Sequence, residues 1–328
     1  MIDDLPPQLD ADAIRALIAE NPDWWAVIGA DAPSDPPVEI LGRGESAVVT
    51  AVGELAVSVP HRPLAELDAP LQEQLAPLGR VPAGLAAIPV AAHTPTPQDP
   101  RAYVVTSRVR GRALAAGDWD DALRARLAER LAGLHVQGVR SGLVDGGPID
   151  PVAEAEGAMS WWRENVPASA KVLEPLWPAV LEHQQQAGPA FTGVPRTLVH
   201  GDVSLPNVLV DEEGTPRLVD WEWSHLGDPA RDLAYLGGPI HAAPWYGPLE
   251  PDQITALLDA YAAARERFGD PVDRHALGVR RAAWLLHETF FTSAHFHRVG
   301  AAGGPESRRY HYAGKDLRAQ ISAYLKDC

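Results

Sequence analysis

Hydrophobic and polar positions follow two different periods along the chain, and the change comes near residue 110. Before it, short apolar runs rich in β-branched residues, separated by turn residues, predict strands over 38–41, 47–52, 55–59, 87–92 and 103–109. Leucines at helical spacing predict one helix among them, over 64–78. The leading segment 8–30 carries an amphipathic helix over 10–20 and an aromatic turn at Trp24-Trp25. These elements predict a small antiparallel sheet with few helices.

After residue 110 the helical period dominates. The segment Asp120 to His135 is predicted as a helix, with Asp118 or Asp120 as its N-cap and Gly138 beyond its end. Further helical blocks cover 150–187 and 250–328, and the insert 197–223 between them is rich in strand formers. We therefore predict an α+β fold of two lobes: residues 1–109, which include the leading segment, and a mainly helical lobe over residues 110–328.

The strand-rich insert holds the polar residues with the most specific spacing. Apolar residues 198–199 lead into the loop His200-Gly201-Asp202-Val203-Ser204-Leu205-Pro206-Asn207, and apolar residues 208–210 follow it. We expect the two apolar ends to pair as a hairpin and to turn Asp202 and Asn207 towards one point. Further along, Asp220 and Glu222 should share one side of an extended segment, because side chains alternate along a strand.

Carboxylates and an amide that meet at one point suit phosphoryl transfer from a magnesium nucleotide. In that reaction one Asp orients the acceptor hydroxyl and takes its proton, while oxygen ligands hold Mg²⁺ on the phosphates. We assign Asp202 as the base, Asn207 and Asp220 as metal ligands, and Glu222 as a further metal ligand. A hairpin with solvated carboxylates is the structural alternative, and the combined spacing of the motifs makes it the weaker interpretation.

The same residues resemble the catalytic segment of the aminoglycoside phosphotransferase and choline kinase group, whose fold is like that of protein kinases. His200-Gly201-Asp202 with Asn207 stands where protein kinases have His-Arg-Asp and Asn, and Asp220-Trp221-Glu222 stands where they have Asp-Phe-Gly. The glycine in place of arginine points to the small-molecule branch. The resemblance, which runs from about Val38 to Leu236, implies that His200 and Asp228 support the catalytic loop and that Asp232 lies near the start of a helix.

The resemblance also implies that the first lobe binds the nucleotide, ATP or GTP, with Mg²⁺. Gly42-x-Gly44 resembles the glycine-rich loop over the phosphates, where missing side chains let backbone N–H groups approach. Residues 103–109 resemble the strand and hinge that receive adenine, with a threonine at the back of the pocket and backbone groups offered by 107–109. The positions implied in nucleotide binding are Gly42, Gly44, Ser46, Ser58, Glu73, Thr106, Ser107 and Val109.

One of these positions departs from the family pattern. Kinases of this kind carry a lysine on the third strand, which pairs with the phosphates and with a helix glutamate. Here that position is Ser58, and Glu73, the expected partner, is left without a lysine. Arg43, His61 or Arg62 could supply the charge instead. Otherwise nucleotide binding is weak or lost.

Composition narrows the choice of partners. The chain of 328 residues has 44 acidic and 28 basic residues, a formal net charge of −16, which disfavours nucleic acid and anionic membranes as partners. Membrane-spanning apolar runs and a secretory signal are lacking, and the single cysteine, Cys328, suits a reducing compartment, so we expect a cytoplasmic protein. The acidity fits a cationic small-molecule acceptor, and it fits a merely solubilising role equally well. The sequence leaves the oligomeric state open.

Three functions remain open at this point. The first is a resistance kinase for a hydroxyl of an aminoglycoside or another antibiotic. The second is a metabolic kinase for choline, an amino sugar or an amino alcohol, and the third, motivated by Ser58, is a kinase-like binding protein without catalysis. Glu164, Asp259 and Glu288 could meet a cationic acceptor and Trp161-Trp162 could line its cleft, although each is more often an ordinary surface or core residue.

Overall fold

The computed structural model describes residues 9–44, 46–61, 64, 71–76, 78–81, 84–140, 144–145, 147–303 and 307–327. The chain forms two compact units. The first comprises Met1–Gly111 and Arg217–Trp223, and the second comprises Arg112–Pro216 and Ser224–Cys328. The segment Arg217–Trp223, which we expected in the second lobe, therefore belongs to the first unit. Among the described helices, none has the length and apolar content that crossing a membrane requires.

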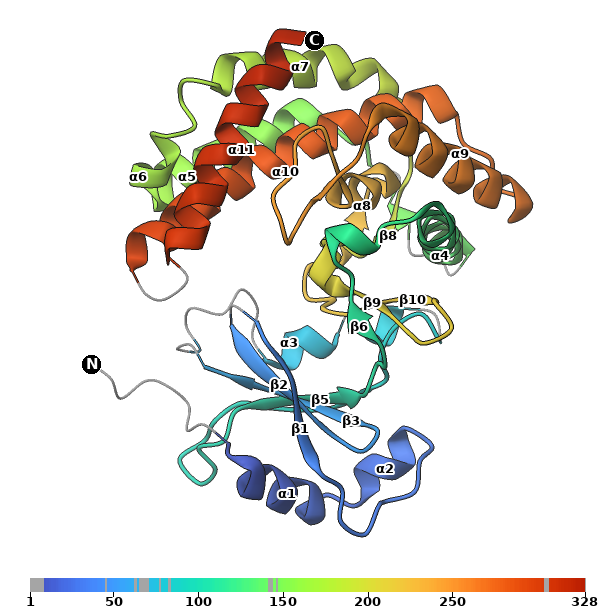
Figure 1. The fold of residues 1–328 in the computed structure, drawn as a ribbon, viewed down its shortest axis with the longest axis vertical. Coiled ribbons are helices and arrows are strands. Elements are labelled where there is room, and N and C mark those ends of the chain that lie inside the picture. Colours follow the sequence, from blue (N-terminus) through green and yellow to red (C-terminus); the bar gives the residue numbers. More distant parts are fainter. Residues whose placement is uncertain are drawn as a thin grey trace. The chain divides into compact units, whose positions relative to one another are not determined.

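A five-stranded antiparallel sheet, in the order β1-β2-β3-β5-β4, forms the first unit (Figure 1). Its strands are β1 (Val38–Arg43), β2 (Ala47–Val52), β3 (Leu55–Pro60), β4 (Pro89–His93) and β5 (Tyr103–Ser107). Each lies where the pattern of β-branched residues predicted a strand, with small shifts at the ends. A register shift between Ile40 and Gly42 marks an irregularity in the edge strand β1.

Helices cover both faces of this sheet. Helices α1 (Ala11–Glu20) and α2 (Asp23–Val27) pack on one face, and α3 (Leu71–Leu75) packs on the other (Figure 1). The amide of Ala13 donates to the Asp10 carboxylate over 2.8 Å and so caps α1. Of the helix predicted over 64–78, residues 65–70 lie outside the described part. A short 3-10 helix, η2 (Leu78–Arg80), follows α3.

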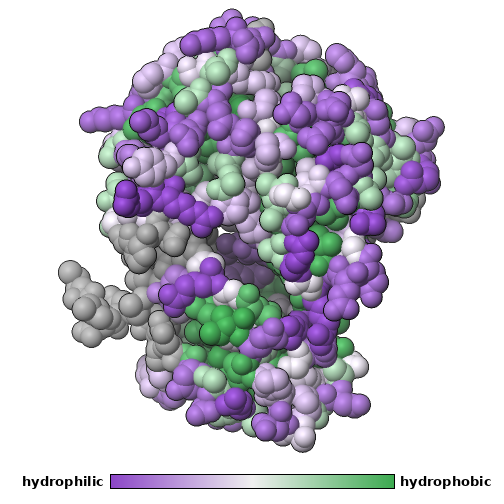
Figure 2. Space-filling view, viewed as in Figure 1, coloured by the Kyte–Doolittle hydropathy of each residue, from purple (hydrophilic) through white to green (hydrophobic). Residues whose placement is uncertain are grey.

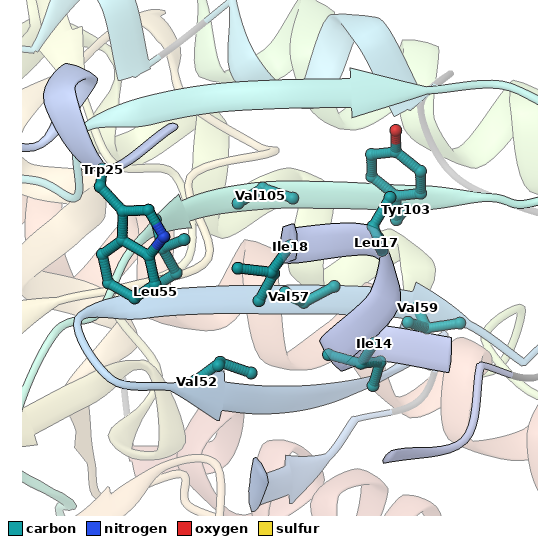
Figure 3. Packing of buried hydrophobic residues seen from close by; sticks show 10 residues of the cluster. All are labelled: Ile14, Leu17, Ile18, Trp25, Val52, Leu55, Val57, Val59, Tyr103 and Val105. Atoms are coloured by element: carbon teal, nitrogen blue, oxygen red, sulfur yellow. The ribbon is translucent and has the colours of Figure 1, made fainter. Parts of the chain in front are cut away.

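The main core of the first unit lies between α1 and the sheet. Ile14, Leu17 and Ile18 recur at helical spacing on α1, and Figure 3 shows them directed at side chains of β3 and β5. The remaining buried members are Trp25, Val52, Leu55, Val57, Val59, Tyr103 and Val105. Some apolar surface stays uncovered: Ile40 in the edge strand is 73% exposed, and Figure 2 shows apolar side chains gathered over the strands of this unit.

The second unit is mainly helical. Its helices are α4 (Asp121–Arg140), α5 (Pro151–Asn165), α6 (Pro167–Ala170), α7 (Trp177–Ala187), α8 (Pro229–Tyr235), α9 (Pro251–Arg267), α10 (Arg274–Ala302) and α11 (Ser307–Asp327), with short 3-10 helices η3 (Ala116–Asp118), η4 (Gly188–Phe191) and η5 (Leu205–Asn207). Helix α10 is buried along most of its length because other helices pack around it, α8 and α11 among them. The α-helices other than α8 match the predicted blocks, with small shifts at their ends.

Short strands complete the second unit and correct the predicted hairpin. They are β6 (Arg112–Ala113), β7 (Val144–Asp145), β8 (Arg196–Val199), β9 (Val208–Val210), β11 (His225–Gly227), β12 (Gly237–Gly238) and β13 (Gly247–Pro248). All but the first residue of β10 (Pro216–Leu218) belong to the first unit. Strand β8 lies between β11 and β7, whereas β9 pairs with β6. The two apolar ends of the loop therefore do not pair with each other, since each finds partners elsewhere in the chain.

Gly138 does not end the helix that precedes it. Helix α4 continues through this residue to Arg140, and a Cβ at Gly138 would lie 2.6 Å from the Thr197 hydroxyl of β8. The hydroxyl of Thr197 also donates to the carbonyl of His135 over 3.0 Å. The glycine thus permits close packing of α4 on β8, a role that a helix-stop interpretation misses. The predicted cap Asp120 is confirmed, because its carboxylate accepts the Leu123 amide over 2.7 Å.

We predict that a buried histidine on α10 makes the fold sensitive to acid. His287 packs between the rings of Trp284 and Phe291, and burial lowers its pKa to about 4. An unfolded histidine has a pKa of about 6.5, so the unfolded state binds more protons between about pH 6.5 and 4, and stability falls as the pH falls through that window. At pH 5 this imidazole should cost about 2 kcal/mol relative to pH 7.

Urea unfolding of His287→Leu at pH 7 and pH 5 checks this prediction. The variant should lose about 2 kcal/mol less stability than the wild type on acidification. His275→Leu, at an exposed position of the same helix, should behave as the wild type does. Equal pH dependence in all three proteins would show that His287 is not the source.

Candidate active site

Asp202 and Asn207 lie on one loop of the second unit and contact each other directly. The chain leaves β8 at Val199, passes through η5 and enters β9 at Val208. The Asn207 amide nitrogen donates to Asp202 Oδ2 over 2.8 Å and to the Asp202 carbonyl over 3.1 Å. These two bonds orient the amide so that its oxygen Oδ1 is left available to another partner. The structure thus brings together the predicted base and one predicted metal ligand.

A buried carboxylate on α8 holds the backbone just before Asp202. Asp232 is fully buried. Its oxygens accept the amide of His200 over 2.8 Å and the amide of Gly201 over 2.9 Å. Within the loop, the buried ring of His200 accepts the Asp202 amide at Nδ1 over 3.3 Å. Two peptide groups and one imidazole therefore fix the approach to the Asp202 side chain.

The same carboxylate is the end of a buried chain of hydrogen bonds. His135 Nε2 on α4 lies 3.0 Å from Asp232, and its Nδ1 lies 2.7 Å from the hydroxyl of Tyr261 on α9. Arg265 donates to that hydroxyl over 2.7 Å. A carboxylate only accepts, so Nε2 carries the hydrogen and Nδ1 accepts from the tyrosine. Burial lowers the pKa of His135, which keeps the ring neutral and consistent with this order of donors.

Electrostatics favour the charged form of Asp232. Burial acts to raise its pKa, but the hydrogen bond from His135 and the amide of His200 outweigh burial and lower the pKa overall. Sequence reasoning placed Asp232 near the start of a helix, which is correct, and missed its contacts. The only sequence signal for its partner is a histidine, His135, among the apolar positions of a predicted helix.

Asp228, which we expected to brace the catalytic loop, has a different set of described contacts. It caps α8 by accepting the Ala230 amide over 3.0 Å. Its second oxygen accepts from Arg280 and from the Trp284 indole, each over 3.0 Å. Asp228 therefore fastens the start of α8 to α10, while the direct contact with the loop backbone belongs to Asp232.

Three of the predicted nucleotide-binding positions, Gly42, Ser58 and Thr106, lie on the sheet face opposite the α1 core. Register places Gly42, Val49, Ser58, Val104 and Ala92 in one row across all five strands. No residue of this row is charged. A Cβ at Gly42 would meet no other atom of the described protein within 4 Å, so internal packing does not explain this glycine.

Arg43, one of the residues proposed to replace the lysine, does not lie in that row. Arg43 is paired with Val48, which is paired with Val59, a member of the core on the opposite face. Arg62 lies outside the described residues. Glu73 is exposed on α3, the helix that packs on the Ser58 face.

Of the residues predicted to bind adenine, Ser107 already uses its backbone N–H within the protein. Thr106 is opposite Ala56 and two positions from Val104, so it shares the face of Ser58. The Ser107 amide donates to the Ile88 carbonyl over 2.9 Å, and its hydroxyl accepts the Ile88 amide over 2.8 Å. Ser107 thus anchors the edge next to β4 and has its N–H engaged, which leaves Val109 as the stronger backbone candidate.

Asp220 has a backbone conformation that L-residues rarely adopt. Its φ is +66°, and it is the one residue other than glycine with positive φ in the described part of the chain. Strand β10 ends at Leu218, and Glu222 lies in a turn, so the predicted extended segment with both carboxylates on one side is wrong. Trp221, between them, is buried, and its indole donates to the Leu218 carbonyl over 3.1 Å. These residues belong to the first unit and Asp202 to the second.

Two of the three acidic residues suggested for an acceptor, Glu288 and Asp259, are already paired. Glu288 Oε1 lies 2.6 Å from Arg231 Nε, and Oε2 accepts the Tyr235 hydroxyl over 2.7 Å. Asp259 pairs with Arg274 over 2.6 Å on the surface. Burial raises the pKa of Tyr235, and the charges of Glu288 and Asp202 add to the effect.

We predict that Asp232→Asn destabilises the protein by about 3 kcal/mol, because an amide cannot accept from all three donors and leaves a buried group unpaired. Urea unfolding at pH 7 measures the change. Asp259→Asn serves as the control, since its exposed ion pair should contribute less than about 1 kcal/mol. A loss at Asp232 as small as that at Asp259 would refute its bracing role.

The sequence of the chain matches that of a known protein family. The model of the phosphotransferase enzyme family APH matches residues 39–271. Viomycin phosphotransferase from Streptomyces vinaceus is 32% identical over 172 residues, which are 47% of this chain and 58% of that protein. The chain therefore spans little more than half the length of that relative.

Solved structures share the fold. The complex of APH(2'')-IIIa with GDP and kanamycin is similar with a TM-score of 0.62 at 18% identity, covering 96% of this chain and 99% of that one. Choline kinase from Cryptosporidium parvum Iowa II gives a TM-score of 0.64 at 14% identity, covering 97% and 95%. These similarities confirm the predicted two-lobed, protein-kinase-like α+β fold. Because the family model covers more than half of its residues, the chain belongs to the phosphotransferase enzyme family.

Proposed function

We propose that this protein transfers the terminal phosphoryl group of a magnesium nucleotide to a hydroxyl group of a small molecule. The observation that carries the proposal is the Asp202–Asn207 pair on a loop whose backbone is bound by the buried Asp232. Phosphoryl transfer depends on positioning more than on covalent chemistry, so a rigid carboxylate at this point is its main requirement. Membership of the phosphotransferase family supports this reaction class.

Asp202 is the proposed general base. Its carboxylate orients the acceptor hydroxyl and receives the proton as that oxygen attacks the phosphorus. The hydrogen bond from Asn207 to Oδ2 fixes the carboxylate orientation. The Leu205 amide of the same loop donates to the carbonyl of Trp245 over 2.9 Å, next to Tyr246, whose ring stacks on that of Tyr235. We propose that this neighbourhood receives the acceptor.

The available donors fit Mg²⁺. The Asn207 amide oxygen and the Asp220 carboxylate are hard oxygen ligands, and Glu222 is a third candidate. No cluster of three or more His, Cys, Asp or Glu side chains suited to a metal occurs in the described part of the chain. The nucleotide phosphates would then supply further ligands, as is usual for this ion. The left-handed backbone of Asp220 supports a functional role, since such strain gathers at functional sites. When bound, Mg²⁺ neutralises charge on the phosphates.

An antibiotic is the acceptor we propose first. The sequence relative is named for viomycin, and a structural neighbour binds kanamycin together with GDP. That GDP complex also makes GTP a co-substrate to test beside ATP. Choline enters the same test because a choline kinase has a similar fold. The positions proposed to meet the nucleotide are Gly42, Gly44, Ser46, Ser58, Thr106 and Val109.

We predict that Asp202→Asn lowers the rate of phosphoryl transfer by at least about a hundredfold and leaves nucleotide affinity nearly unchanged, because the base acts only in the chemical step. Transfer from ATP or GTP to viomycin, kanamycin and choline is measured with the wild type and the variant. Asp316→Asn, an exposed position on α11, should retain full activity. Undiminished transfer by Asp202→Asn would remove the assigned base, and a wild type that binds no nucleotide would favour a non-catalytic binding protein.

We predict that Ser58→Lys tightens ATP binding several-fold and leaves adenosine binding unchanged. The substitution adds a cation to an uncharged row of the sheet, on the face to which we assign the phosphates. Calorimetric titration with ATP and adenosine separates the two contributions. Ala56→Lys, two positions away on the same face of β3, is the positional control. A large loss of ATP affinity in Ser58→Lys would show that this face does not meet the phosphates.

A further inference from the structure

The turn between β1 and β2 is tied to the end of β3 by one histidine. His61 directly follows β3, and its backbone N–H donates to the Ser46 carbonyl over 3.0 Å. Its ring nitrogen Nε2 lies 3.1 Å from the Gly44 carbonyl oxygen. Across the turn, the Gly44 amide donates to the Ala47 carbonyl over 2.8 Å. His61 therefore contacts residues on both sides of the turn.

The hydrogen bond from the His61 ring to Gly44 does not require a positive charge on the ring. A carbonyl oxygen only accepts, so His61 Nε2 must carry a hydrogen. That hydrogen is present both in the neutral Nε2–H tautomer and in the imidazolium, so the bond persists whichever form the ring takes. A role as a cation for phosphate would instead require the protonated ring.

Because the sheet row that contains Ser58 is uncharged, a hydrogen bond that fixes the β1–β2 turn can assist phosphate binding. The row that contains Ser58 offers no charge to a phosphate in the described strands. Among the described groups of this unit, we therefore assign phosphate binding to backbone N–H groups of the glycine-rich turn other than the Gly44 amide, which Ala47 already accepts. Oriented amides bind anions well only when their geometry is held. A turn that is already fixed loses less conformational freedom when the ligand binds.

We infer that His61 is a positioning residue for the nucleotide phosphates: it holds the turn that carries Gly44 and Ser46 and so offsets part of the loss of the lysine at Ser58. This inference rests on the proposed function. The interaction is one hydrogen bond at a partly exposed site, so its removal should weaken phosphate binding about fivefold.

Two substitutions separate the hydrogen bond from the charge. His61→Leu removes the donor, whereas His61→Gln keeps an N–H at a similar reach and cannot become cationic. His93→Leu is the matched control, because His93 is the other histidine of the first unit and its ring lies 3.4 Å from the Asp99 carbonyl in a different loop. Affinities for ATP with Mg²⁺, for GTP with Mg²⁺ and for adenosine are measured by calorimetry. Amide hydrogen exchange of residues 46–50 is measured without nucleotide.

The expected result is selective. His61→Leu should bind the triphosphate preferred by the wild type about fivefold more weakly and adenosine unchanged, with faster exchange at 46–50. His61→Gln and His93→Leu should match the wild type in both measurements. Unchanged triphosphate affinity in His61→Leu, or an equal loss in His61→Gln, would overturn the inference while nucleotide binding by the wild type stands. A wild type that binds neither triphosphate would overturn the proposed function and this inference with it.

Discussion

The site depends on one buried negative charge. Asp232 has no arginine or lysine among its described partners, so hydrogen bonds from two peptide groups and the His135 imidazole must offset the cost of removing it from water. The two peptide groups belong to the catalytic loop and the imidazole belongs to α4, and α9 extends the network through Tyr261. A shift of any one element would leave the charge poorly solvated. The position of the loop is thus tied to the packing of the helices.

The short helix α8 connects this charge to the rest of the second unit. Asp228 at its start is bound by Arg280 and Trp284 of α10, and Asp232 one turn later faces the loop. Two carboxylates of one short segment therefore bind different partners: Asp228 binds side chains of α10, and Asp232 binds the backbone of the loop. A loop that has little regular structure of its own gains the rigidity of α10 in this way, which a positioned base requires.

Local periodicity was enough to predict the five strands of the first unit and the long helices. The failures concern partners that are distant in sequence. The strands beside the loop looked complementary, yet β8 and β9 pair in different sheets. Gly138 looked like a helix end because its contact with Thr197 has no local signature. The resemblance implied a bracing role for Asp228, and nothing in the spacing reveals that Asp232 is the carboxylate that accepts the amide of His200. The positive φ of Asp220 could not be predicted either, because such a conformation is usually indicated in a sequence by a glycine.

The first unit is discontinuous, because Arg217–Trp223 belongs to it although the whole stretch Arg112–Pro216 intervenes. During synthesis the ribosome therefore releases the five strands of the sheet long before it releases Asp220. The loop that carries Asp202 and Asn207 is also made before the first unit is complete. The first unit cannot be exchanged between relatives by a single crossover after Gly111, since such a hybrid would pair a sheet from one parent with an Asp220 segment from another. Recombination that preserves the site has to move both segments together.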